Sequence, residues 1–195
     1  MIVSRRVGFP VKSSLASRWK YSRVALYLAV SQAVAGRLTE AGVPAQRIRV
    51  VYDGVPLPPP PIPVPGRVVA LASKPAHVPG IPIHLTTNLW QDLSTASIFV
   101  YISEMEGLGS AALAAMAAGV PVIASRVGGL PEAIEHERTG LLIDPTELAG
   151  AVRRLLDDPA AAAEMGRRGR ELVQEKFTVE TMVAATLRAY EEVAK

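Results

Sequence analysis

A glycine corner before an alanine-rich run is the stretch of this sequence best suited to bind phosphate. Gly107, Leu108 and Gly109 precede Ser110, where an expected helix begins. The first turn of a helix carries unpaired N–H groups and about half a unit of positive charge, so it binds phosphate without a side-chain cation. Glycine lets the backbone approach such a ligand closely. A tight turn that needs glycine for its backbone angles is an equally good explanation, and both stay open at this point.

Glu106 and Lys74 are the charged side chains that could act at this corner. Glu106 directly precedes the first glycine and can accept hydrogen bonds from sugar hydroxyls, although a surface turn is the simpler explanation of its position alone. Lys74 follows the apolar run 67–72 and could neutralise a diphosphate. A lone lysine is more often exposed to solvent, so both roles are hypotheses.

The sequence predicts no metal site and no catalytic histidine. His77, His84 and His136 have neither metal-ligand spacing nor a paired nucleophile, and the chain has no cysteine. We therefore expect no metal and no resident cofactor.

The elements around the corner predict a parallel α/β sheet. The β-rich run 97–102 leads into the corner, a helix follows as far as Gly119, residues 120–124 form the next expected strand, and the pair 128–129 turns the chain. This order is the βαβ unit of a doubly wound sheet, whose ligands lie at the carboxyl ends of the strands. The expected fold class is α/β, with a Rossmann-like parallel sheet and flanking helices.

The remaining elements fit the same fold. Ser31 is expected to cap a helix that Gly42 ends, between strands at 24–30 and 49–52. Further expected elements are strands at 67–72 and 83–85, a short helix at 88–96, and C-terminal helices that begin after Asp144, Asp158 and Thr178. Arg167, Arg168 and Arg170 are most simply a solvated face. The last helix carries an apolar stripe, expected to be core or a docking surface, at Val179, Met182, Val183, Leu187, Tyr190 and Val193.

A proline-rich run divides the chain. Residues 56–65 contain seven prolines, which favour an extended, semi-rigid segment without sheet hydrogen bonds. We therefore expect residues 1–55 to be the remnant of one Rossmann-like domain, residues 56–66 a linker, and residues 67–195 a second domain with the C-terminal helices.

Charge and hydropathy indicate how the chain could interact with a membrane. The 195 residues are 49% hydrophobic and carry a net charge of +3, and no apolar run approaches the roughly 20 residues of a membrane helix. The N-terminal region is basic and meets no acid before Glu40, with cations at Arg5, Arg6, Lys12, Arg18, Lys20 and Arg23. A solvated face is the simpler explanation, and contact with anionic membrane lipid is the alternative.

The same region could instead be a signal peptide, with the apolar run 24–30 and a cleavage site at residues 33–35. Ser31 disfavours this alternative, because it is expected to cap a helix.

One rival enzyme hypothesis is an NADP-binding Rossmann oxidoreductase. Residues 107–112 fit the loose pattern G-x-G-x-x-A, and Arg126 lies where a 2′-phosphate would bind. Glu104 and Glu106 argue against it, because they separate the strand from the glycines and would repel a pyrophosphate.

Residues 99–144 closely resemble the donor-binding domain of the family 4 retaining glycosyltransferases of the GT-B fold (glycosyl transferases group 1). The resemblance lies in E-G-x-G at 106–109, A-M-A-x-G-x-P-V-I-A-S at 115–125, G-G-x-P-E-x-I at 128–134 and T-G-L-L at 139–142. Residues 24–55 resemble the end of the family's N-terminal domain, residues 69–74 the strand before its diphosphate-binding lysine, and the last helices its C-terminal end.

The resemblance implies a nucleotide-sugar donor in a cleft between two Rossmann-like domains. Carried over by position, Glu106 faces the donor sugar, Gly107–Ser110 bind the diphosphate, and Lys74 neutralises its charge. The sugar passes to an acceptor hydroxyl with retention, in a hexosyltransferase-type reaction that depends on positioning and leaving-group electrostatics. The acceptor, a glycan or a lipid-linked molecule, is not identified, and no nucleic acid is expected.

This sequence departs from the family pattern at several positions. Ala114 stands where the family has a second glutamate that holds the donor ribose; losing such a partner costs roughly 1.5–3 kcal/mol, or about 10–100-fold in donor affinity. Pro75 replaces a glycine, Ile102 a proline and Ser97 an aspartate. The family also has further elements after residue 77, and two full Rossmann domains do not fit into 195 residues.

The leading hypothesis is therefore a shortened, glycosyltransferase-like protein in the cytoplasm or peripheral to the inner face of a membrane. The alternative is a non-catalytic module that binds a nucleotide sugar or completes a partner chain. Sheet edges left exposed by missing strands would favour a homo-oligomer.

Overall fold

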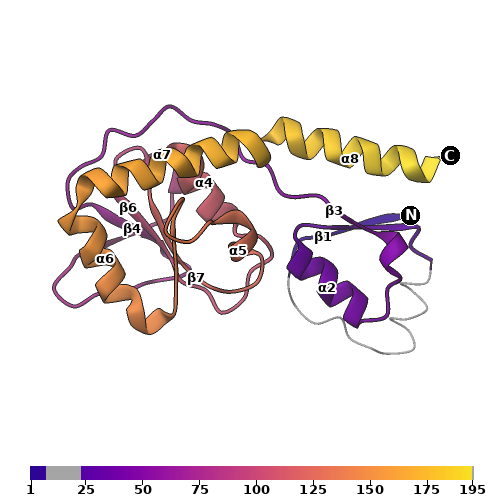
Figure 1. Ribbon diagram of the computed structural model, residues 1–195, viewed down its shortest axis with the longest axis horizontal. Coiled ribbons are helices and arrows are strands. Elements are labelled where there is room, and N and C mark those ends of the chain that lie inside the picture. Colours follow the sequence, from indigo (N-terminus) through magenta and orange to yellow (C-terminus); the bar gives the residue numbers. More distant parts are fainter. Residues whose placement is uncertain (8–22, 195) are drawn as a thin grey trace.

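The computed structural model describes residues 1–7 and 23–194, which form two parallel sheets (Figure 1). The first sheet has the order β1 (Ile2–Arg5), β2 (Leu26–Ala29), β3 (Ile48–Val50). The second has the order β5 (Ile83–Thr86), β4 (Val68–Leu71), β6 (Ile98–Tyr101), β7 (Val122–Ser125), β8 (Leu141–Ile143). Every strand pairing in both sheets is parallel. The predicted α/β fold with parallel sheets and flanking helices is confirmed.

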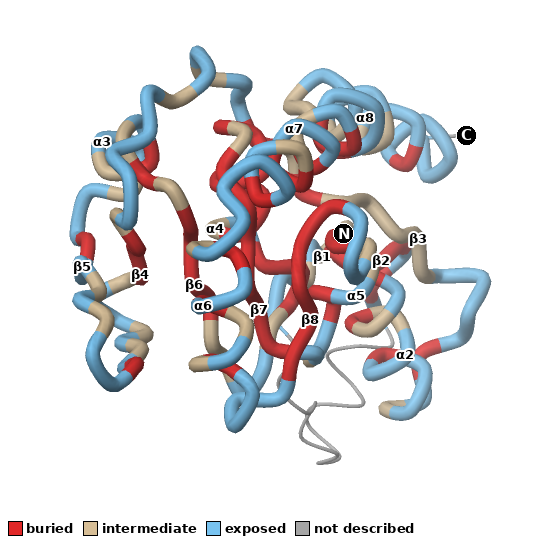
Figure 2. Tube along the Cα trace, turned by 60° about the vertical axis from the view of Figure 1, so that its left-hand side comes forward, coloured by how far each residue is buried: buried red, intermediate tan, exposed pale blue. Residues whose placement is uncertain are grey.

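Alternate residues of the second sheet fill two separate cores. Phe99 and Tyr101 of β6 join the core under α4 (Ser110–Ala118) and the C-terminal part of α7 (Pro159–Lys176). Ile98 and Val100 join the core on the other side, under α6 (Leu148–Asp157) and the first turns of α7. This period of two is that of a strand with both faces covered. The central strands are accordingly red in Figure 2, with β5 at the more exposed edge.

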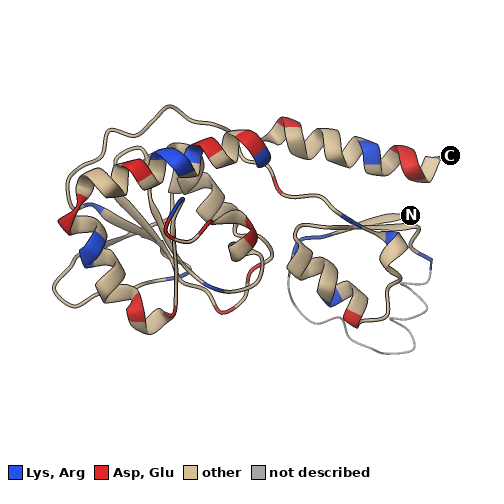
Figure 3. Cartoon of the chain, viewed as in Figure 1, with Lys and Arg blue, Asp and Glu red and all other residues tan. Residues whose placement is uncertain are grey.

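Helix α4 is rich in alanine, and this lets it pack closely against its neighbours. Residues 112–118 are all buried, between the second sheet and α7. Gly166 of α7 lies so close to the end of α4 that a Cβ there would stand 2.1 Å from the carbonyl oxygen of Gly119. Arg170 donates to the carbonyl of Ala117 at the same end, so it stabilises a helix C-terminus. The expectation that Arg170 is solvated is wrong, whereas Arg167 and Arg168 are exposed and pair with acids such as Glu164 along α7 (Figure 3).

The helix starts expected from capping residues are confirmed. Ser31 accepts from the N–H of Val34 at the start of α2 (Gln32–Glu40), and Asp158 accepts from Ala161 at the start of α7. Asp144 and Glu147 form the capping box, and Thr178 accepts from Thr181 at the start of α8 (Val179–Ala194). The remaining elements are α3 (Leu89–Leu93), α5 (Leu130–Ala133) and two 3₁₀ turns, Ala45–Arg47 and Pro145–Glu147.

The proline-rich run forms neither helix nor strand. It leaves the first sheet, arches over α7 and reaches β4 (Figure 1). Ile62 and Val64 donate backbone hydrogen bonds to the carbonyls of Ser94 and Thr95, both at 2.9 Å. Residues 62–64 of the run are therefore held against the segment between α3 and β6 of the second sheet. One hydrophobic cluster includes Tyr27 of β2 and Leu130 of α5, so apolar packing continues across both sheets.

Helix α8 extends beyond α7 over the first sheet (Figure 1). Ala189 is its buried residue and packs with Leu26 and Leu28 of β2. Four members of the predicted stripe are exposed: Val183, Leu187, Tyr190 and Val193. The stripe is thus not core, because α8 faces the sheet with a small residue. Among the described residues, no helix combines the length and apolar character needed to cross a bilayer.

The basic N-terminal region is described only in part. Lys12, Arg18 and Lys20 lie outside the described residues. The apolar run 24–30, considered as part of a leader, contains β2, which lies between β1 and β3 with all four residues buried.

Candidate functional site

The structure brings Lys74 and Glu106 together at the carboxyl edge of the second sheet. Lys74 follows β4 and Glu106 follows β6, and these two strands are neighbours that pair in parallel. Parallel neighbours end at the same edge of a sheet, which explains why residues 32 apart in sequence form an ion pair.

The carboxylate of Glu106 is the centre of a four-residue cluster. Its Oε1 atom accepts hydrogen bonds from Lys74, from the Tyr101 hydroxyl at 2.8 Å and from the Ser103 hydroxyl at 2.9 Å. Lys74 Nζ lies 2.7 Å from Ser103 Oγ and 4.5 Å from the centre of the Tyr101 ring. Tyr101 and Ser103 were not among the residues predicted from the sequence, although their position at the end of β6, before the corner, is a signal that could have identified them.

Partial burial changes the acid–base properties of this cluster. Burial lowers the pKa of Lys74 and raises the pKa of Tyr101. The adjacent carboxylate opposes the shift of Lys74, because an opposite charge favours the protonated lysine. The cluster thus combines an amino group, a carboxyl group and two hydroxyls, which suits it to bind phosphate oxygens and sugar hydroxyls.

The glycine corner next to this cluster is tightly packed. A Cβ at Gly107 would stand 2.2 Å from the carbonyl oxygen of Arg6, and Ser31 donates to the Gly107 carbonyl at 2.7 Å. Gly109 has a φ of +95°, and a Cβ there would stand 2.5 Å from Leu130 Cδ2. Leu108 is buried. The Arg6 backbone at Gly107 and the left-handed φ at Gly109 thus require glycine at these positions, whatever ligand the corner binds.

Asp53 and Arg6, which no sequence pattern assigned to the site, connect to the start of α4 through Ser110. Ser110 Oγ donates to Asp53 Oδ2 at 3.2 Å, and Asp53 Oδ1 lies 2.8 Å from an Arg6 guanidinium nitrogen. The sequence indicated Arg6 only as one of the cations of the basic N-terminal region. Asp53 and Ser110 are 57 residues apart, so no local pattern connects them.

Other residues considered in the sequence for a binding or catalytic role are buried in the core or bonded to residues outside the Lys74–Glu106 cluster. Ala114 is buried in the core. Arg126 is exposed and donates to the carbonyl of Leu142, and residues 102–106 separate β6 from the glycines, unlike a dinucleotide corner. His84 pairs with Asp92, and His136 accepts from the N–H of Leu142. Within the described ranges no group of His, Asp and Glu is placed to hold a metal ion.

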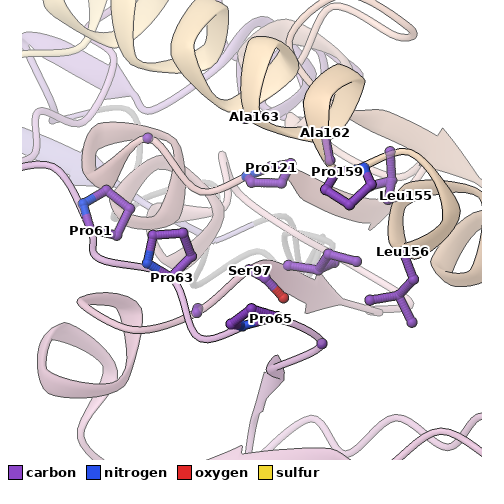
Figure 4. Close-up of a pocket in the computed structure, with 14 residues that line it drawn as sticks. Pro61, Pro63, Pro65, Ser97, Pro121, Leu155, Leu156, Pro159, Ala162 and Ala163 are labelled. Atoms are coloured by element: carbon purple, nitrogen blue, oxygen red, sulfur yellow. The ribbon is translucent and has the colours of Figure 1, made fainter.

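A cavity of about 610 Å³ lies at the opposite end of the second sheet (Figure 4). The proline-rich run lines one side through Pro61, Pro63 and Pro65, and the other side includes Pro121 and Leu155. Because Pro121 precedes β7, this cavity belongs to the amino ends of the strands and is not part of the site at their carboxyl ends.

A family model matches the part of the chain that contains the glycine corner. Residues 82–172 match the family model of glycosyl transferases group 1. This segment contains Glu106, the glycine corner and Ala114, whereas Lys74 and Arg6 lie before it.

Two curated relatives show how far the similarity extends. The chain is 39% identical over 111 residues to an N-acetyl-alpha-D-glucosaminyl L-malate synthase of Bacillus anthracis, covering 55% of this chain and 29% of that protein. It is also 39% identical over 127 residues to a D-inositol 3-phosphate glycosyltransferase of Pseudarthrobacter chlorophenolicus, covering 64% of this chain and 30% of that protein. The chain thus spans under a third of the length of either relative.

Solved structures share the fold over nearly the whole chain. Anabaena HepE, in complex with UDP and glucose, superposes with a TM-score of 0.76 at 15% identity, covering 99% of this chain and 71% of that one. At this identity the likeness shows the fold alone, which is that of the GT-B enzymes.

Proposed function

We propose that this chain, whose residues 82–172 match the family model of glycosyl transferases group 1, is glycosyltransferase-like and binds a nucleotide-diphosphate sugar at the Lys74–Glu106 cluster and the glycine corner. The diphosphate accepts hydrogen bonds from the N-terminus of α4, Lys74 neutralises the charge, and Glu106 accepts hydrogen bonds from the donor sugar. No metal is needed in this scheme.

One observation carries the proposal: Lys74 and Glu106 are in direct contact, and Glu106 directly precedes the glycine corner that leads into α4. A helix N-terminus and an adjacent lysine form an anion site, while a carboxylate beside it would be unfavourable unless it binds another part of the ligand. Sugar hydroxyls are donors that suit this carboxylate. One relative is named an N-acetyl-alpha-D-glucosaminyl L-malate synthase and the other a glycosyltransferase, and the HepE structure is a complex with UDP and glucose. These names support a nucleotide sugar as the ligand class here.

The reaction that we propose is transfer with retention. The acceptor hydroxyl attacks the anomeric carbon as the bond to the diphosphate oxygen breaks, and that phosphate takes the hydroxyl proton. Lys74 and the first N–H groups of α4 stabilise the negative charge that develops on the leaving group. The protein supplies position and electrostatics, so no side-chain nucleophile is required. The acceptor, membrane contact by the basic N-terminal region and self-association remain hypotheses.

Calorimetric titration of the full chain with UDP- and GDP-sugars tests the proposal. Binding of one nucleotide sugar, followed by sugar transfer or donor hydrolysis, would support an active transferase. Failure of every nucleotide sugar to bind would contradict it.

Glu106→Gln tests the role of the carboxylate separately. We expect the variant to lose about 10–100-fold in affinity for the nucleotide sugar and to lose none for the free nucleoside diphosphate, because the carboxylate that competes for Lys74 is removed. Equal losses for both ligands would show that Glu106 does not bind the sugar.

A non-catalytic nucleotide-sugar module is the second candidate, and Ala114 favours it. This residue is buried and cannot hydrogen-bond a ribose hydroxyl through its side chain. Donor binding without transfer or hydrolysis, with any acceptor tried, would identify the module.

A further inference from the structure

Arg6 and Asp53 reach the glycine corner from the first sheet. Glu106 precedes the corner and holds Lys74, whereas Ser110 follows it and donates to Asp53, which holds Arg6. The carbonyl of Arg6 also packs against Gly107. The first sheet therefore brings Arg6 to Gly107 and, through Asp53, to Ser110, while the second sheet brings Lys74 to Glu106, the residue before Gly107.

Burial separates the roles of the two partners. The Asp53 side chain is 11% exposed, while the Arg6 side chain is 61% exposed. A guanidinium has five N–H donors in a fixed fork, so Arg6 can keep a contact with Asp53 and still bind an anion from solvent. Planar, bidentate recognition of phosphate is the chemistry for which arginine is suited.

Each cation at the corner is neutralised by its own carboxylate: Lys74 by Glu106 and Arg6 by Asp53. A diphosphate that enters at Ser110 brings negative charge next to both pairs. It competes with Glu106 for Lys74, which frees that carboxylate for sugar hydroxyls, and with Asp53 for Arg6. Exchange of carboxylate for phosphate keeps both cations paired in either state.

We propose that Arg6 is a second diphosphate-binding residue, contributed by the first sheet, and that Asp53 holds it at the start of α4 when no ligand is bound. The inference rests on the proposed function, because it takes the glycine corner as the diphosphate site. It adds a ligand-binding residue from outside the segment 82–172 that carries the family pattern.

Titration with UDP, GDP and inorganic pyrophosphate tests this role. Arg6→Ala should weaken pyrophosphate binding by about 10-fold, and Arg6→Lys should restore part of the loss, because the charge returns without the fork. Arg37→Ala is the matched control: Arg37 is also an exposed arginine in an ion pair, with Glu40 of α2, and its loss should leave the affinity within twofold. Melting temperatures verify that each variant is folded.

The Asp53→Asn background separates direct binding from mere neutralisation of Asp53. The amide oxygen of the substituted side chain can still accept the hydrogen bond from Ser110, while the competing charge is removed. This change alone should therefore tighten pyrophosphate binding by about 3–10-fold. If Arg6 contacts the diphosphate, adding Arg6→Ala still weakens binding by about 10-fold. If Arg6 only neutralises Asp53, Arg6→Ala has no effect in this background, and the inference is overturned.

The failure of the inference differs from the failure of the proposed function. Normal binding by Arg6→Ala, with intact binding by the parent chain, overturns the inference alone. Failure of the parent chain to bind any of the three probes overturns the diphosphate site and the inference with it.

Discussion

Lys74 combines a partly buried position with a direct carboxylate partner, and this makes the pH dependence of ligand binding informative. Its ammonium group has a lowered pKa because burial disfavours the charged form. The charge that binds a diphosphate is therefore lost at a lower pH than for an ordinary lysine.

We predict that UDP affinity falls as pH rises through the lowered pKa of Lys74, beginning below the ordinary lysine value of about 10.4. Lys74→Arg should keep its affinity across this range, because arginine stays protonated. Lys74→Ala should lose about 10–100-fold at neutral pH and show no such alkaline decrease. Calorimetry between about pH 7 and about pH 10 measures this, and an alkaline decrease that persists in Lys74→Ala would assign it to another group.

Gly109 illustrates how a residue can be required by packing before any ligand is considered. Gly109→Ala must place a Cβ in the left-handed region at φ +95° and against Leu130. We predict a loss of about 2–4 kcal/mol in unfolding free energy, measured by urea denaturation. Gly36→Ala is the control, because Gly36 lies inside α2 with no atom within 4 Å of its added Cβ; it should gain about 0.5–1 kcal/mol. Equal effects of the two substitutions would contradict this account.

At the scale of elements, Glu132 connects the two sheets through a helix end. Its carboxylate accepts from the N–H groups of Gln32 at 2.7 Å and Ala33 at 2.8 Å, at the start of α2, and lies 3.2 Å from the Tyr52 hydroxyl. A carboxylate at a helix N-terminus satisfies free donors and opposes the helix dipole. The G-G-x-P-E pattern therefore has a structural role: its glutamate holds the first sheet against α5.

We predict that Glu132→Ala lowers the unfolding free energy by about 1–3 kcal/mol. Burial, and after it the charge of Glu132, raises the pKa of Tyr52, so the same variant should shift the Tyr52 titration to lower pH, followed by ultraviolet absorbance. Glu135→Ala is the control, because Glu135 pairs with Arg138 on the surface and should change stability by less than about 1 kcal/mol. An unchanged Tyr52 titration in Glu132→Ala would argue against the contact.

The elements themselves follow largely from local sequence. Ser31, Asp158 and Thr178 cap helices where their side chains can reach backbone N–H groups two or three residues ahead, a property of the chain nearby. The α8 stripe was harder to interpret, since apolar periodicity identifies a face without identifying its partner. Ala189, outside the stripe, makes the contact with β2.

At the scale of the whole molecule, the proline-rich run indicates two domains, whereas the hydrophobic core is continuous between the two sheets. The run supports the predicted division at residues 56–66, which stays a prediction. The core cluster, however, contains residues of both sheets, such as Val34 of α2 and Leu108 of the corner. Shared apolar packing couples the unfolding of the parts that share it.

We predict a single cooperative thermal transition for the full chain, with equal calorimetric and van't Hoff enthalpies. The physical reason is that separating the first sheet from the second exposes part of one common core. Differential scanning calorimetry measures this directly. Two resolved transitions would show that residues 1–55 unfold independently of the rest.

The sequence alone determined the α/β class, the helix starts, the succession of strand, helix and strand along the chain at the corner, and the resemblance carried by residues 99–144. Periodicity, capping and glycine placement act over a few residues, so the local sequence contains them. It also identified Lys74 and Glu106 as candidates. Only the tertiary structure decided that these two touch, that Tyr101 and Ser103 join them, and that Arg6 reaches Ser110 through Asp53. Such contacts depend on which strands lie side by side, and strand order within a sheet is set by long-range packing that no local pattern contains.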